Sequence, residues 1–285
     1  VKILYDSFFR SVMNPELYPD RLQGMLSCIL GMEIASFHVL ETSSFALGDV
    51  KSLVIMDIVV ELLDGSIINL EVQKIGYDFP GERAACYASD LTLRQYARAW
   101  RDAAKKASED PGHKFSYHSI HPVYTIVLIE KSPSLFCKFP DQYIHRFSQK
   151  SDTGLSMELL HNYIFIPLDI FRKKHQNENI STELDAWLTF LSTEEPDEIM
   201  RLCDAFPFFR DIYRHIYEIC QNTEDVMGIF SEALAELDRN TVDYMIDELK
   251  RSNEQLQGEK KQLQDENTRL KEELDNMRKQ LREQK

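Results

Sequence analysis

The chain has 285 residues, of which 43% are hydrophobic, and it carries a formal net charge of −14. This acidity argues against a protein that coats nucleic acid non-specifically, so any contact with nucleic acid has to come from a local basic patch. No apolar run approaches the ~20 residues that cross a bilayer, and five scattered cysteines without a CxxC pair favour a reducing, cytoplasmic setting.

The order of apolar segments predicts a mixed α/β protein. The predicted elements are a helix over 5–30, a strand over 33–40, a hairpin over 53–73, a helix over 82–107, strands over 122–129 and 163–168, and helices over 181–237. Pro15 and Pro19 should break the first helix into two pieces. We therefore expect an α/β fold, a mixed β-sheet with flanking helices followed by a helical C-terminal part.

The predicted hairpin carries polar side chains where a buried strand would have apolar ones. Side chains alternate between the two faces of a strand. The even positions from Val54 to Leu62 and from Ile68 to Val72 are all apolar. The polar residues all fall on odd positions, and they are Asp57, Glu61, Asn69, Glu71 and Gln73. Buried carboxylates are costly without a positive partner, so the pair Asp57 and Glu71 indicates a divalent metal.

The length of the hairpin loop decides which residues face each other. A two-residue turn at Asp64-Gly65 would place Asp57 opposite Val72 and send Glu71 to the other face. A three-residue loop over 64–66, with one residue in the left-handed conformation, pairs position 57 with 73, 59 with 71 and 61 with 69. We predict this second register, because it alone gives one clean apolar face.

A heptad repeat fills the last 43 residues, 243–285. The d positions are Leu249, Leu256, Leu263, Leu270 and Met277. Asn253 and Asn267 occupy a positions, which favours a parallel two-stranded coiled coil and a homodimer. The alternative is a single solvated, charged helix. The predicted organisation is therefore a core over 1–180, a helical extension over 181–242 and a coiled-coil helix over 243–285.

The hairpin resembles the active site of the PD-(D/E)xK nuclease superfamily, in which an Asp precedes a Glu-x-Lys-type motif on the next strand. Asp57 is followed fourteen residues later by Glu71-Val-Gln73. More narrowly, the chain resembles the transposase-like branch, also called recombination-promoting nucleases. Four segments match that branch in order, namely Asp6-Ser-Phe-Phe9-Arg10 (D-x-x-F-K/R), Arg83-Ala-Ala-Cys-Tyr87 (R-x-x-x-Y), Pro122-Val-Tyr-Thr-Ile126 (P-V-Y-x-I) and Trp187-Leu-Thr-Phe190-Leu191 (W-L-x-F-L). The resemblance covers about residues 5–220 and implies a restriction-endonuclease-like core.

The resemblance also implies a function and a set of ligands. Asp57, Glu71 and the backbone carbonyl of Val72 would hold Mg²⁺, with Mn²⁺ as the alternative ion. The protein would be an endonuclease that hydrolyses phosphodiester bonds in DNA and promotes recombination. Gln73 stands where the superfamily usually has Lys, and its amide can hydrogen-bond a water but supplies no positive charge. The alternative is a catalytically inactive nuclease fold that acts as a coiled-coil scaffold.

The helix after the hairpin carries a one-sided basic stripe. Its members recur at helical spacing and are Arg83, Tyr87, Arg94, Arg98, Arg101 and Lys105. Arg83 and Tyr87 lie at the start of the helix, so we expect them to face the metal site as catalytic residues, with Arg83 supplying the charge that Gln73 lacks. We expect the other four to contact phosphates of nucleic acid. The alternative is a solvated outer face.

Four further polar residues remain as candidates. Asp6 either caps the first helix, which we favour, or joins the acidic cluster. Glu33 precedes the first strand and is a candidate on position alone. Glu61 and Asn69 share the polar face of the hairpin but lie towards its turn, so we expect them to be solvated.

Overall fold

The computed structural model describes residues 3–4, 6–42, 56–74, 76, 79–109, 112, 114–175, 179–221 and 260. The chain divides into a unit over Val1–Thr223 and a second over Glu224–Lys285. The described elements are α1 (Asp6–Val12), α2 (Pro19–Leu30), β1 (Phe37–Val39), β2 (Ile58–Leu62), β3 (Ile67–Gln73), α3 (Pro80–Glu109), η1 (Tyr117–Ser119), β4 (Val123–Ile129), α4 (Ser134–Cys137), β5 (His145–Phe147), β6 (His161–Pro167), α5 (Leu168–His175), α6 (Glu183–Ser192), α7 (Pro196–Ala205) and α8 (Phe208–Gln221). No described helix is long and apolar enough to cross a membrane.

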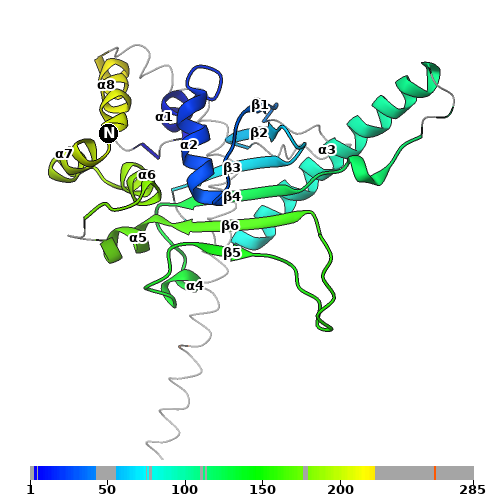
Figure 1. Ribbon diagram of the computed structural model, residues 1–285. Helices are drawn as coiled ribbons and strands as arrows, with labels where there is room; N and C mark the ends of the chain where they lie inside the picture. Colours follow the sequence, from blue (N-terminus) through cyan, green and yellow to red (C-terminus); the bar gives the residue numbers. More distant parts are fainter. Residues whose placement is uncertain are drawn as a thin grey trace, which may run out of the picture. The chain divides into compact units, whose positions relative to one another are not determined.

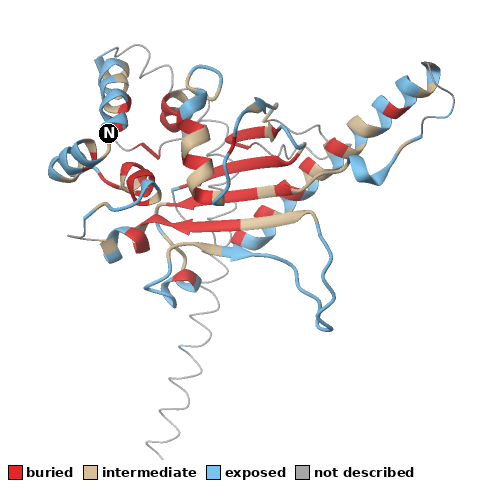
Figure 2. Cartoon of the chain, in the orientation of Figure 1, coloured by how far each residue is buried: buried red, intermediate tan, exposed pale blue. Residues whose placement is uncertain are grey.

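One six-stranded sheet, in the order β1-β2-β3-β4-β6-β5, organises the first unit (Figure 1). The three central strands β3, β4 and β6 run parallel. The hairpin β2–β3 and the two edge strands pair antiparallel. Strands β2, β3 and β4 and the second half of β6 are largely buried, whereas the edge strands β1 and β5 are not (Figure 2). The predicted mixed sheet with flanking helices is therefore confirmed.

The two faces of the hairpin pack against different helices. Even-numbered side chains, such as Ile58, Val60 and Ile68, join a large apolar core with α1, α2 and α6. The odd-numbered Val59 and Ile67 instead pack against residues of α3. The odd face therefore combines a smaller apolar cluster with the polar residues, underneath α3.

Most predicted helices and strands are present. The first helix is divided into α1 and α2, and Pro19 occupies the first turn of α2, where a missing N–H is tolerated. The helix predicted over 82–107 is α3, extended slightly at both ends. The helices predicted from 181 onwards are α6 to α8, as far as Gln221. The remainder of that stretch and the coiled coil over 243–285 lie outside the described residues, apart from Lys260.

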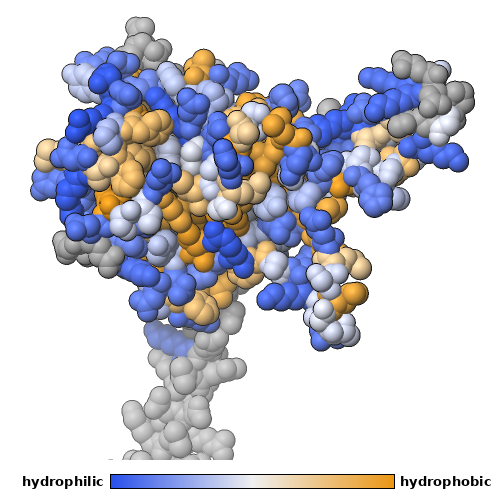
Figure 3. Space-filling model, in the orientation of Figure 1, coloured by the Kyte–Doolittle hydropathy of each residue, from blue (hydrophilic) through white to orange (hydrophobic). Residues whose placement is uncertain are grey.

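The sequence missed four short elements, η1, α4, β5 and α5. The strand β5 has only three residues, two of them exposed, so it lacks an alternating apolar pattern. Helix α5 follows β6 without a loop, and the predicted strand over 163–168 includes its first residue, Leu168. The connection between β5 and β6 exposes Leu155, Met157 and Leu159 to solvent (Figure 3).

The predicted register of the hairpin is wrong by two residues. The observed pairs are Glu61 with Ile67, Val60 with Ile68, Val59 with Asn69 and Ile58 with Leu70. Continuing this ladder by one residue places Asp57 beside Glu71, whereas the sequence predicted Gln73. The predicted assignment of side chains to the odd and even faces is nevertheless correct, because a shift of two residues leaves every side chain on the same face.

The cause of the shift lies in the loop. Three residues form it, as predicted, but they are positions 63–65, one earlier than expected. The N–H of Leu62 donates to the carbonyl oxygen of Ser66 at 2.8 Å, which closes the loop. The Asp64 carboxylate accepts the N–H of Ser66 at 2.9 Å and holds that residue in the ladder. Gly65 is the residue in the left-handed region, with φ of +86°.

We predict that Gly65→Ala lowers the free energy of unfolding by about 1–3 kcal/mol, because an L residue is strained at this φ. An added Cβ would also lie 2.5 Å from the ring of His121. Urea unfolding followed by circular dichroism measures the change. Gly81→Ala is the matched control: its Cβ meets nothing within 4 Å in α3, so we expect it to be stabilising by about 0.4–1 kcal/mol. Equal effects of the two substitutions would contradict the argument.

Candidate active site

The two predicted metal-binding acids lie together on the face of the sheet that α3 covers. Glu71 is in the middle of β3, and Asp57 lies immediately before β2. Only 7% of Asp57 and 2% of Glu71 is exposed, so water solvates neither carboxylate well. The N–H of Val72 donates to Oδ2 of Asp57 at 2.6 Å, which fixes the Asp57 carboxylate beside the strand that carries Glu71.

Burial raises the pKa of both acids, and the charge of Asp57 adds to the shift of Glu71. Burial, and after it the charge of Asp57, raises the pKa of Glu71 well above its ordinary value. Burial also raises the pKa of Asp57, against the opposing effect of Arg10. Both acids are therefore easier to protonate than in water, and a bound cation would relieve the conflict.

Two arginines bring positive charge to the acids. Arg10 of α1 donates from Nη2 to Oδ1 of Asp57 at 3.1 Å and to the carbonyl oxygen of Met56 at 2.8 Å. Arg83 of α3 donates from Nε to the hydroxyl oxygen of Tyr87 at 2.6 Å. The charge of Arg83 lowers the pKa of both acids, so it lies within electrostatic reach of them. Arg83 and Tyr87 thus lie together within electrostatic reach of the acids.

Tyr87 is a hydrogen-bonding group here. Burial, and after it the charge of Glu71, raises its pKa above the ordinary value for a phenol. The hydroxyl therefore stays protonated at neutral pH. Because it accepts from Arg83, it fixes the orientation of that guanidinium and leaves its own proton free for a second acceptor.

Gln73 and Asn69 are also buried on this face. Gln73 is 5% exposed and Asn69 is fully buried, so the prediction that Asn69 is solvated is wrong. The parallel pairing of β3 with β4 covers Asn69 with Thr125 of the next strand. Among the described residues, Oε1 of Glu71 and Oε1 of Gln73 are buried acceptors without a hydrogen-bond donor. Acceptors left in this state at a buried site are suited to a cation or an ordered water.

The available oxygens fit a hard divalent cation. Asp57 and Glu71 supply two carboxylates. The N–H and C=O of one residue in an extended strand point to the same side, so the carbonyl of Val72 is directed to the side on which its N–H meets Asp57. An all-oxygen, doubly negative set is typical of Mg²⁺ sites that keep several waters. The described residues contain no cluster of three or more acidic, His or Cys side chains that could hold a metal, so protein ligation would rest on these few oxygens.

The basic stripe on α3 is divided by intramolecular ion pairs. Arg94 pairs with Asp90 at 2.7 Å. Arg98 makes two hydrogen bonds to the Glu61 carboxylate, at 2.6 and 2.7 Å, so Glu61 is paired and the prediction that it is merely solvated is wrong. Arg101 and Lys105 are exposed. The stripe therefore offers its freest positive charge towards the far end of α3.

Arg10 is the site residue whose contact the sequence did not predict. It belongs to the D-x-x-F-K/R segment, but its partner Asp57 is 47 positions away and no local spacing indicates that contact. Asp6 begins α1, and its side chain lies outside the described residues. Glu33 is exposed in the connection between α2 and β1. Neither residue is shown to contact the acids.

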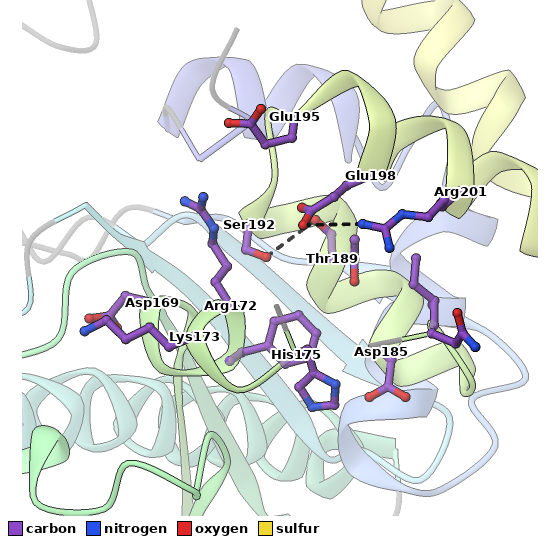
Figure 4. A pocket seen from close by; sticks show the side chains of 13 residues that line it. Asp169, Arg172, Lys173, His175, Asp185, Thr189, Ser192, Glu195, Glu198 and Arg201 are labelled. Atoms are coloured by element: carbon purple, nitrogen blue, oxygen red, sulfur yellow. Dashed lines mark hydrogen bonds and ion pairs between the residues drawn. The ribbon is translucent and has the colours of Figure 1, made fainter. Parts of the chain in front are cut away.

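Two cavities differ in their relation to the acids. A cavity of about 200 Å³ opens beside Asp57 and is lined by Arg10, Asn14, Glu16 and Thr42 among others. A cavity of about 430 Å³ lies among α5, α6 and α7, with basic and acidic side chains facing it (Figure 4). The second cavity contains none of the predicted site residues. Of the two acids, Asp57 lines the first cavity and Glu71 does not, so the first cavity gives access to the Asp57 side of the candidate site.

Comparison with known protein families finds one match for the chain. The family described as PD-(D/E)XK nuclease family transposase matches residues 4–244. No curated protein and no solved structure matches. The matched range contains both acids, α3 and the helices α6 to α8. The resemblance seen in the sequence, to the superfamily and to its transposase-like branch, is thereby confirmed.

We predict that Glu71→Gln raises the free energy of unfolding of the metal-free protein at neutral pH by about 0.5–2 kcal/mol, because it removes one of two conflicting buried charges. The pKa of Glu71 is raised in the folded state. Ionised Glu71 therefore lowers the free energy of unfolding by its full amount at pH values above that raised pKa. The cost vanishes below about pH 4.3, where the unfolded chain is protonated too. The advantage of the variant should therefore grow with pH.

Urea unfolding in the presence of EDTA, repeated between mildly acidic and neutral pH, measures this difference. Glu158→Gln is the control, because Glu158 is exposed in the β5–β6 connection. We expect the control to stay within about 0.5 kcal/mol of the wild type at every pH. A Glu71→Gln variant less stable than the wild type at neutral pH would show that the two acids are not in conflict.

Proposed function

This chain belongs to the PD-(D/E)XK nuclease family transposases, and we propose that it is a metal-dependent endonuclease that hydrolyses phosphodiester bonds in DNA. The observation that carries the proposal is the convergence of Asp57 and Glu71 from neighbouring strands in a buried site with unsatisfied acceptors. An isolated structural ion pair would join one acid to one base, whereas here two acids are brought together beside Arg10 and Arg83. Such an arrangement is costly and is typical of a functional site.

In this proposal Asp57, Glu71 and the carbonyl of Val72 hold Mg²⁺, and Mn²⁺ is accommodated by the same oxygens. When bound, the ion supplies a nucleophilic water of lowered pKa and stabilises the charge that develops on the phosphate. Both acids have to be ionised to serve as ligands, so the raised pKa of Glu71 makes binding weaker as the pH falls. The hairpin holds the Asp57 carboxylate in place through the N–H of Val72.

The neighbouring side chains have distinct tasks. The buried amide oxygen of Gln73 accepts a hydrogen bond from the attacking water and orients it. Arg83, oriented by Tyr87, supplies the positive charge that a Lys at position 73 would provide. The phenol of Tyr87 remains protonated and acts as a hydrogen-bond donor to the phosphate or its leaving oxygen. None of these three residues takes up the proton of the water, so solvent does.

We further propose that DNA follows α3. Arg94, Arg98, Arg101 and Lys105 line the helix beyond Tyr87, and a one-sided basic strip of this kind suits contact with a phosphate backbone. Arg94 and Arg98 already neutralise acids of this chain. We therefore assign the stronger phosphate contacts to Arg101 and Lys105.

The proposal includes a homodimer formed through residues 243–285, which would bring two active sites together and allow both strands to be cut. A cytoplasmic location and a role in recombination belong to the same proposal. The scaffold alternative is favoured by Gln73, because a neutral amide replaces the usual cation. Plasmid nicking by the wild type and the acid variants separates the endonuclease from the scaffold.

We predict that the full chain nicks plasmid DNA in the presence of Mg²⁺ and that Asp57→Asn and Glu71→Gln each lower the rate by at least about a hundredfold, because each removes a charged ligand. Gel electrophoresis of supercoiled plasmid against time measures the rate. Glu158→Gln should cleave as the wild type does. Equal nicking by all four proteins, or nicking by none, would favour the scaffold alternative.

We predict that Arg101→Gln and Lys105→Gln each weaken DNA binding uniformly across sequences and reduce the slope of log affinity against log salt by about 1. Fluorescence anisotropy with a labelled duplex measures this, in the Glu71→Gln background so that the DNA is not cut. Lys138→Gln, which removes an exposed charge from the end of α4, is the control. Arg98→Gln should instead lower stability, since it leaves Glu61 unpaired. Unchanged salt slopes for both variants would remove α3 from the DNA interface.

A further inference from the structure

Arg10 lies on one of the two oxygens of Asp57, the carboxylate that the proposed metal has to share with Glu71. Its guanidinium donates to Oδ1 of Asp57, while the N–H of Val72 donates to Oδ2 of the same carboxylate. Both oxygens of Asp57 therefore have a donor in the absence of any ion. A cation that approaches Asp57 meets a group of its own sign at 3.1 Å from one of the two oxygens.

When both acids are ionised, as metal ligation requires, the charges of the site balance without a metal. Arg10 and Arg83 carry two positive charges, and the ionised Asp57 and Glu71 carry two negative charges. A divalent ion would leave an excess of two positive charges. Even in bulk water, a guanidinium ~5 Å from a doubly charged ion weakens its binding by about tenfold, and more strongly in a drier site.

The two arginines differ in how firmly they are held. Arg83 is fixed by its bond to the buried Tyr87. Arg10 is 31% exposed at its side chain and forms part of the wall of the cavity that opens beside Asp57. The exposed residue Glu16 lines the same cavity. The guanidinium of Arg10 thus has room to leave Asp57, and the ion has a route to reach it.

We propose that Arg10 occupies the cation's position at Asp57 in the metal-free protein and is displaced when a divalent ion binds. The guanidinium keeps the acidic pair compensated, and it sets a threshold concentration below which the site stays without metal. This inference rests on the proposed function, since it needs a metal at Asp57. It differs from that function in predicting that loss of a basic residue improves metal binding.

Isothermal titration of Mg²⁺ into the full chain tests the proposal. Arg10→Gln and Arg10→Met both remove the charge, and the Met variant keeps an apolar stem. We expect each to bind Mg²⁺ about tenfold more tightly than the wild type. Arg10→Lys keeps the charge and should stay within about threefold of the wild type. Arg214→Gln, which removes an exposed arginine of α8, should bind as the wild type does.

The outcomes separate the inference from the proposed function. Equal or weaker binding by Arg10→Gln and Arg10→Met, with normal binding by the wild type, would overturn the competition and leave the metal site standing. Binding by no variant, including the wild type, would remove both proposals. Tighter binding by the two neutral variants, lost again when Asp57→Asn is added, would support the inference. Thermal unfolding with and without Mg²⁺ gives a second readout, in which the neutral variants should gain more stability from the ion than the wild type.

Discussion

Two carboxylates held side by side under a helix are the constraint around which the rest of the site is arranged. Neither Asp57 nor Glu71 is well solvated, burial raises the pKa of both, and the charge of Asp57 further disfavours the ionisation of Glu71. The fold tolerates this conflict because the opposite face of the same hairpin belongs to a large apolar core with α1, α2 and α6. Odd- and even-numbered side chains of a strand point to opposite faces of the sheet. Residues that pack in the apolar core therefore alternate with residues of the candidate site along β2 and β3.

The same constraint explains the placement of α1 and α3. Helix α3 crosses the polar face and delivers Arg83 and Tyr87 to the acids, while its own apolar residues pack on Val59 and Ile67. Helix α1 packs on the other face, and Arg10 reaches Asp57 where β2 begins. Further along α3, Arg98 forms two hydrogen bonds with Glu61 and ties the helix to the turn end of the hairpin. The acids are thus enclosed by basic groups that come from two different layers.

The sequence predicts which side chains share a face better than it predicts which residues touch. The alternation of polar and apolar residues in the hairpin established the faces, because that signal is local and repeats every two residues. The pairing depended on whether Ser66 belongs to the loop or to the ladder, and in the structure the backbone N–H and the hydroxyl of Ser66 both donate to the Asp64 carboxylate. Arg10–Asp57 and Arg98–Glu61 join residues 47 and 37 positions apart. Contacts of this kind depend on how layers pack, so a single sequence does not indicate them.

The contact between Arg10 and Asp57 gives a physical reason why a neutral residue, Gln73, is compatible with this site. A Lys at position 73 would give the site three positive charges against two carboxylates, and a buried ammonium beside two guanidinium groups would be costly. With Gln at this position, Arg10 and Arg83 already balance Asp57 and Glu71. The neutral amide is therefore compatible with a site whose positive charge comes from helices, and the loss of Lys from the motif does not by itself imply a loss of compensation. A positive charge on strand β3 and one on a helix differ in how freely the side chain can move. A strand residue is fixed in the sheet, whereas the partly exposed Arg10 borders a cavity into which its guanidinium can move.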